Sequence, residues 1–146
     1  MNLKDKVVVI TGAGSGIGAA TAKLFGAHKA IVVVSDINLE SAEKVASEIR
    51  DDGGKALALA TDVTQFEQVN ELLQKVIAKY DSLDVMVNNA GIGGKQQAKT
   101  ADHTLEDWHN VIAVNQTGVF YCMKLAIQQM LKQGYGNIVN VASLAG

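Results

Sequence analysis

The sequence predicts an α/β domain built on a doubly wound parallel sheet. Short apolar runs alternate with longer amphipathic stretches along the 146 residues, which is the pattern of strands joined by crossover helices. The strands are continuous apolar runs, so both of their faces are expected to be buried. A chain of this length fits one domain that buries about 68% of its unfolded surface.

Three strands and two helices are predicted in the first part of the chain. The strands are Lys6–Thr11 (KVVVIT), Ala30–Ser35 (AIVVVS) and Lys55–Thr61 (KALALAT), each a short apolar run. Gly16–His28 and Leu39–Asp52 are longer, and the second is rich in Glu, Lys and Ala, which favour helices. Each of the first two strands is followed by a helix after a short connection, as a crossover requires.

The second part of the chain continues the alternation. Gln65–Tyr80 has apolar residues three or four positions apart and is predicted to be a helix. A fourth strand in LDVMVNNAG ends near Asn89, and residues 104 to about 132 form one long helical region. Gly136–Ala142 is a fifth strand. The stretch GIGGKQQAKTAD before the long helix predicts a flexible loop.

Composition narrows the possible partners. The net charge of −2 argues against a nucleic-acid partner or an anionic membrane surface. The single cysteine, Cys122, excludes an internal disulfide framework, and the scattered histidines predict no metal site. The apolar run near the N-terminus is too short for a signal peptide or a spanning helix. We therefore expect a cytoplasmic protein.

The glycine-rich stretch TGAGSGIG, residues 11–18, joins the first strand to the first helix. Its glycines let the backbone approach an anion, and the helix directs free N–H groups to the same place. A pyrophosphate is the natural ligand, and a tight turn without a ligand is the alternative. The loop has no Lys, which argues against a phosphoryl-transfer P-loop. The cofactor site then includes Gly12, Ser15, Gly16, Ile17 and Gly18.

An acidic residue, Asp36, ends the second strand twenty residues after Gly16. A carboxylate there can accept hydrogen bonds from an adenosine ribose and would repel a 2′-phosphate. Neither Ser15 nor the neighbours Ile37 and Asn38 supplies a cation to offset this. The pattern favours NAD over NADP, although a methyltransferase can also combine a glycine-rich loop with an acid at the second strand.

The later motifs resemble those of the classical short-chain dehydrogenase/reductase family. The loop fits the family's T-G-x-x-x-G-x-G, Asp62–Val63 follows the third strand where the family contacts adenine, and Asn88–Gly91 (NNAG) ends the fourth. Asn115 and Ser143 lie where the family keeps a helix asparagine and a catalytic serine. These five motifs occur in the family's order and span nearly the whole chain. A methyltransferase has no need of this set.

The resemblance implies a Rossmann-like sheet, incomplete, with about five strands in the order 3-2-1-4-5. Residues 1–146 would be a dinucleotide-binding domain lacking its C-terminal part. The implied activity is NAD(H)-dependent hydride transfer to or from a small secondary alcohol or ketone, in which Ser143 donates to the substrate oxygen and Asn115 holds a helix break and a water. The family also implies cofactor contacts at Ile37, Asp62, Val63, Asn89, Ala90 and Gly91, and leaves Asn88 a partly structural role.

The acid of this family is a Tyr with a Lys four residues later, about a dozen residues after the serine. No tyrosine in this chain has that partner: Tyr80 is followed by Asp84, Tyr121 by Leu125 and Tyr135 by Val139. The sequence therefore predicts the first part of a longer enzyme, with a non-catalytic dinucleotide-binding module or pseudoenzyme as the alternative.

The 104–133 helix is apolar around much of its circumference. One face should pack on the sheet, and the other needs a partner. In the family this helix helps form a subunit interface, so the resemblance implies a homo-oligomer.

Overall fold

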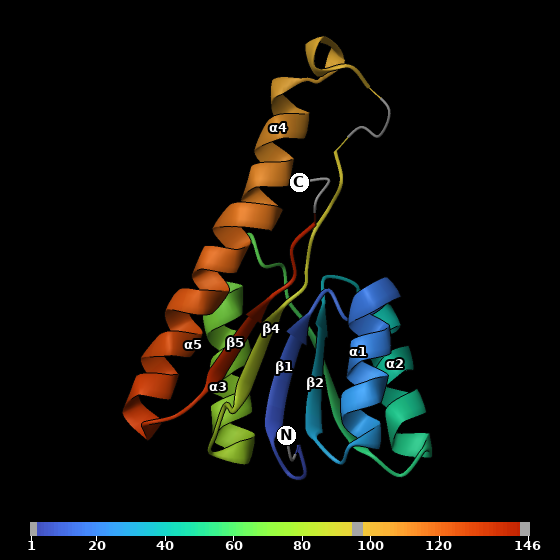
Figure 1. Cartoon of the computed structure of the whole chain (residues 1–146), viewed down its shortest axis with the longest axis vertical. Helices are drawn as coiled ribbons and strands as arrows, with labels where there is room; N and C mark the ends of the chain where they lie inside the picture. Colours follow the sequence, from blue (N-terminus) through green and yellow to red (C-terminus); the bar gives the residue numbers. More distant parts are fainter. Residues whose placement is uncertain (1–2, 95–97, 144–146) are drawn as a thin grey trace.

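The computed structural model describes residues 3–94 and 98–143. Within them lies a parallel sheet of five strands in the order β3-β2-β1-β4-β5 (Figure 1). This order and the parallel pairing confirm the fold predicted from the sequence. The strands are β1 (Val7–Thr11), β2 (Ile31–Asp36), β3 (Lys55–Ala60), β4 (Val85–Asn88) and β5 (Asn137–Asn140).

Helices cover both faces of the sheet (Figure 1). α1 and α2 pack together on one face, and α3 and α5 pack together on the other. The long region predicted at 104–132 is α4, a π-helical segment η2 and α5 in direct succession. The helices are α1 (Gly16–Ala27), α2 (Leu39–Asp51), α3 (Phe66–Tyr80), η1 (Thr100–Asp102), α4 (Leu105–Ile112), η2 (Ala113–Gly118) and α5 (Val119–Gln133).

Alternate residues of the central strand point to opposite faces and build two cores. Val8 and Ile10 of β1 belong to the cluster beneath α1 and α2, whereas Val7 and Val9 belong to the cluster beneath α3 and α5. All four are at most 2% exposed. Burial on both faces explains why the strand sequence is a continuous apolar run.

The apolar core gives way to polar side chains where the strands reach their carboxyl ends. Thr11, Ser35 and Asn88 are each at most 2% exposed. Thr11 and Ser35 are register partners on β1 and β2, and Asn88 ends β4. This polar edge is where open parallel sheets bind their ligands.

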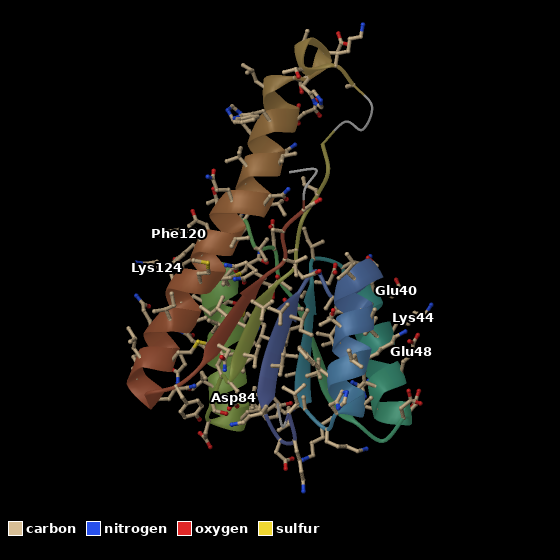
Figure 2. The ribbon with its side chains drawn as sticks, viewed as in Figure 1. Glu40, Lys44, Glu48, Asp84, Phe120 and Lys124 are labelled. Carbon is tan, nitrogen blue, oxygen red and sulfur yellow. The ribbon has the colours of Figure 1, made fainter. Side chains whose placement is uncertain are left out.

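The opposite edge of the sheet is held by a carboxylate. Asp84, labelled in Figure 2, accepts from the Lys6 ammonium at 2.7 Å and from the Val7 N–H at 3.0 Å. The hydrogen bond to Asp84 raises the pKa of Lys6. The contact joins the beginnings of β1 and β4, at the end of the sheet away from the glycine loop.

Two regions differ in detail from the sequence prediction. β5 is shorter than the predicted Gly136–Ala142, and its side chains are exposed except for Ile138, which is partly buried. The predicted flexible loop contains residues 95–97, which lie outside the described residues, and a 3₁₀ turn, η1. Among the described residues, no helix is long and apolar enough to cross a membrane.

Candidate functional site

A crevice of about 400 Å³ lies at the carboxyl edge of the sheet. It brings together most of the residues predicted from sequence to bind a cofactor. Gly16 and Gly18 are the exceptions, because neither lines the crevice. Thr61, Ile92 and Val114 line it and were not predicted. The predicted residues that line it are Gly12, Ser15, Ile17, Asp36, Ile37, Asp62, Val63, Asn89, Ala90 and Gly91.

The glycine loop is packed so closely at Gly12 and Gly18 that neither position has room for a side chain. A Cβ on Gly12 would lie 2.7 Å from the Ala90 Cα, and one on Gly18 would lie 2.4 Å from the Gly12 carbonyl oxygen. Gly16 faces open space but has a φ of +54°, which side chains disfavour. Gly12 and Gly18 therefore let the loop lie against the segment that follows β4, and Gly16 supplies the turn.

The first turn of α1 is open to an anion. Its N-cap, Ser15, is extended, and the Ser15 side chain makes no capping hydrogen bond. The first turn contains no acidic residue. The helix itself therefore supplies neither an acceptor for the free N–H groups nor a negative charge for the positive end of its dipole. A negatively charged group bound in the crevice would supply both.

Asp36 is held rigidly at the crevice. Its Oδ2 accepts from the Gly14 N–H at 2.9 Å, and its Oδ1 accepts from the Asn38 N–H at 3.0 Å. Each carboxylate oxygen can accept more than one hydrogen bond, so the carboxylate retains capacity for hydroxyl donors. The same contacts connect the end of β2 to the glycine loop.

Asn89 and Thr11 tie the glycine loop to β4. The Asn89 Nδ2 donates to the carbonyl oxygens of Thr11 and Gly12, both at 3.0 Å. The Thr11 Oγ1 accepts from the N–H groups of Asn89 and Ala90, both at 3.2 Å. Asn89 lines the crevice in which it was predicted to contact a cofactor, and its amide nitrogen also braces this junction. Sequence reasoning did not assign the Thr11 hydroxyl a role.

The Asp62–Val63 segment forms another wall. The Asp62 Oδ1 accepts from the N–H and from the hydroxyl of Thr64, at 2.9 and 2.7 Å. Val63 is 7% exposed, and a Cβ on Gly118 would lie 2.8 Å from its Cγ2. Gly118 thus lets the helical region approach this wall closely.

Asn115 lies in the π-helical segment, Ala113–Gly118. Its Oδ1 accepts from the Ile92 N–H and its Nδ2 donates to the Ile92 carbonyl oxygen, both at 2.9 Å. The side chain is exposed and does not line the crevice. Its paired hydrogen bonds connect the helix to Ile92, which does line it.

Ser143 follows the end of β5 and is exposed. It lies three residues beyond Asn140, the register partner of Asn88. Like Asn115, it does not line the crevice. Within the described ranges, no group of three His, Cys, Asp or Glu residues could hold a metal ion.

The sequence matches the model of a known protein family. The family model described as short chain dehydrogenase matches residues 6–146. The chain belongs to the short-chain dehydrogenase family. This confirms the family resemblance seen in its motifs.

Relatives in the short-chain dehydrogenase family match the chain throughout. A 3-oxoacyl-[acyl-carrier-protein] reductase of Thermotoga maritima is 42% identical over 146 residues, covering 100% of this chain and 58% of the relative. An NAD⁺-bound xylitol dehydrogenase has a TM-score of 0.95 and 36% identity, covering 100% of this chain and 56% of that one. A metagenomic short-chain oxidoreductase in complex with NADP has a TM-score of 0.92 and 32% identity, covering 99% and 65%. The chain therefore spans less than two thirds of each of these proteins.

Proposed function

We propose that residues 1–146 form the dinucleotide-binding domain of an NAD(H)-dependent oxidoreductase acting on a secondary alcohol or ketone. The observation that carries this proposal is the meeting of three features at one crevice: the glycine loop, the uncapped start of α1 and the fixed carboxylate of Asp36. The N–H groups of α1 would hold the diphosphate, and Asp36 would accept from the adenosine ribose.

The apolar lining of the crevice fits the flat rings of such a cofactor. Ile17, Ile37 and Ile92 line it and are 69%, 72% and 45% exposed. Exposed isoleucines gathered at one cavity favour an apolar ligand surface. Asp62 and Val63 would border the adenine. When bound, the nicotinamide supplies or accepts the hydride.

The preference for NAD over NADP rests on charge. Asp36 is acidic, and none of the lining residues within 3–94 and 98–143 is Lys or Arg. A 2′-phosphate on the ribose would therefore meet a carboxylate without a compensating cation from these residues. Relatives with either cofactor occur in the family, so this choice depends on Asp36.

Ser143 and Asn115 are the chain's proposed contributions to the chemistry. The Ser143 hydroxyl would donate to the substrate oxygen, and losing one positioned donor of this kind typically costs about 10²–10³ in rate. Asn115 would hold the irregular helix segment beside the site and a water leading to the proton relay. Residues 1–146 do not include the family's Tyr-x-x-x-Lys acid, so this proposal assigns the acid to none of them.

That missing motif favours one second candidate, a dinucleotide-binding module without catalytic activity. It shares the crevice with the first proposal and differs only in turnover. The two are separated by testing the full-length protein with NAD and a panel of secondary alcohols, and with NADH and the corresponding ketones.

The exposed apolar surface of α4 and α5 supports a homo-oligomer. Trp108 and Phe120 are 62% and 56% exposed, and Phe120 projects from the helix away from the sheet in Figure 2. Sedimentation equilibrium tests this: a Trp108→Glu, Phe120→Glu double variant should shift the protein toward the monomer.

The binding proposal is tested by titrating the protein with NADH and following the nicotinamide fluorescence. We expect saturable binding that NAD competes away. A full-length protein that binds neither NADH nor NADPH would overturn both candidate functions.

A further inference from the structure

Two asparagines form a side-chain hydrogen bond across neighbouring strands, three residues before Ser143 in the case of Asn140. Asn88 and Asn140 are register partners on β4 and β5, which lie side by side in Figure 1. The Asn88 Nδ2 donates to the Asn140 Oδ1 at 2.7 Å. In addition, the Val141 N–H donates to the Asn88 carbonyl oxygen at 3.0 Å. Asn88 thus binds the end of β5 through both its backbone and its side chain.

The buried side chain of Asn88 lowers the stability of the fold at this position. It is 2% exposed, and its Oδ1 is buried with no hydrogen-bond partner among the described residues. A buried acceptor without a partner lowers stability, and an apolar residue of similar size would avoid this cost. Specifying the position of a neighbouring segment is one reason for a protein to keep a buried polar group.

Apolar packing at the end of β5 is limited among the described residues. β5 is the last strand of the sheet in the described part of the chain. Val139 and Val141 are 47% and 44% exposed, so apolar packing holds this end weakly. The Asn140 Nδ2 also contacts the Met123 Sδ at 3.3 Å, and sulfur is a weak acceptor. Together with the backbone pairing of β5 with β4, the hydrogen bonds to Asn88 hold the carboxyl end of this strand.

We propose that Asn88 and Asn140 are a positioning pair that fixes the end of β5 and, with it, the Ser143 hydroxyl. The inference rests on the proposed function in assigning Ser143 as the donor to the substrate oxygen. Neither asparagine touches the substrate; each acts through the strand. Since Ser143 lies three residues beyond Asn140, a small displacement of the strand end moves the hydroxyl.

The test uses variants of Asn140, because its side chain is exposed and changing it leaves no hole in the core. Asn140→Leu keeps the approximate shape but removes the acceptor for the Asn88 Nδ2. Asn140→Asp keeps an acceptor and loses the donor to Met123. Asn137→Leu is the matched control, because Asn137 is an exposed asparagine at the beginning of the same strand.

Two readouts are measured on the full-length protein. Amide hydrogen exchange of residues 141–143 should become about tenfold faster in Asn140→Leu, the effect of losing one hydrogen bond from a local opening equilibrium. In the same variant kcat should fall about 10- to 100-fold, as misplaced catalytic groups do, with the NADH Kd unchanged. Asn140→Asp should restore both quantities, and Asn137→Leu should change neither.

Three results would overturn the proposal. One is exchange at residues 141–143 that is equal in Asn140→Leu and the unsubstituted protein. Another is an Asn140→Asp variant as impaired as Asn140→Leu, which would assign the effect to Met123 or to general packing. The third is a normal kcat despite faster exchange. A protein without turnover at all would refute the catalytic function proposed above, and the exchange comparison would still decide whether the pair fixes the strand end.

Discussion

The Gly14 N–H donates a hydrogen bond to the Asp36 Oδ2 at 2.9 Å, so the acid that closes β2 also holds the glycine loop. A Cβ on Gly14 would lie 2.9 Å from that same oxygen, which shows how closely the two residues pack. The proposed role of Asp36 in cofactor choice and its hold on the loop thus depend on one carboxylate, and a substitution of Asp36 must be interpreted with a control that separates them.

Asp36→Ala should weaken NADH binding and reduce the discrimination against NADPH. It removes both the proposed acceptor for the ribose and the negative charge that would face a 2′-phosphate, and hydrogen bonds to charged groups are each worth about 1.5–3 kcal/mol. We expect the NADH Kd to rise at least about tenfold, measured by fluorescence titration with each cofactor. Asp36→Asn is the control, since its amide oxygen can still accept from Gly14. An unchanged NADH-to-NADPH preference in Asp36→Ala would show that the cofactor assignment is wrong.

Gly18→Ala should destabilise the fold although alanine is the better helix former. Helix propensity alone would favour alanine by about 1 kcal/mol, but the new Cβ would lie 2.4 Å from the Gly12 carbonyl oxygen and 2.5 Å from the Asn89 Nδ2. We expect a net loss of about 1–3 kcal/mol in the free energy of unfolding, measured in urea. Ala20→Gly, at an exposed position of the same helix, should lose about 1 kcal/mol through propensity alone. A Gly18→Ala variant as stable as the unsubstituted protein would contradict the packing described for this loop.

Asn115→Leu should loosen the connection between the π-helical segment and Ile92. The change removes both paired hydrogen bonds and leaves the Ile92 backbone without these partners. We expect the free energy of unfolding to fall by about 1–3 kcal/mol and amide exchange at Ile92 to become faster. The neighbouring Gln116→Leu, exposed and in the same segment, serves as the control. Unaltered exchange at Ile92 would mean that the pairing does not hold this segment.

Cys122 should be inert toward thiol reagents in the folded protein. Burial raises the pKa of its thiol to about 12, whereas an unfolded cysteine ionises near pH 8.5. Between these values the thiol is neutral only in the folded state, so the stabilisation linked to it is complete below about pH 8.5 and declines as the pH rises toward 12. Labelling with a disulfide reagent at pH 8 should be slow in buffer and fast in urea. Rapid labelling of the folded protein would contradict the burial of this residue.

The sequence by itself determined the parallel sheet and the main features of the crevice. The continuous apolar runs and the glycine loop are local patterns, in which residues close along the chain carry the signal. Asp36 was assigned in the same way, from its place after the second strand. These inferences needed only the rule that parallel strands present their carboxyl ends at one edge.

Only the tertiary structure decided which side chains brace that edge. The Asn89 amide donates a hydrogen bond to Thr11, 78 residues away in the sequence. Asn115 is hydrogen-bonded to Ile92, 23 residues away. The bond between Asn88 and Asn140 spans 52 residues. No local pattern encodes such pairings, because an asparagine can donate and accept in many directions and its partner is chosen by how the strands and helices come together in space.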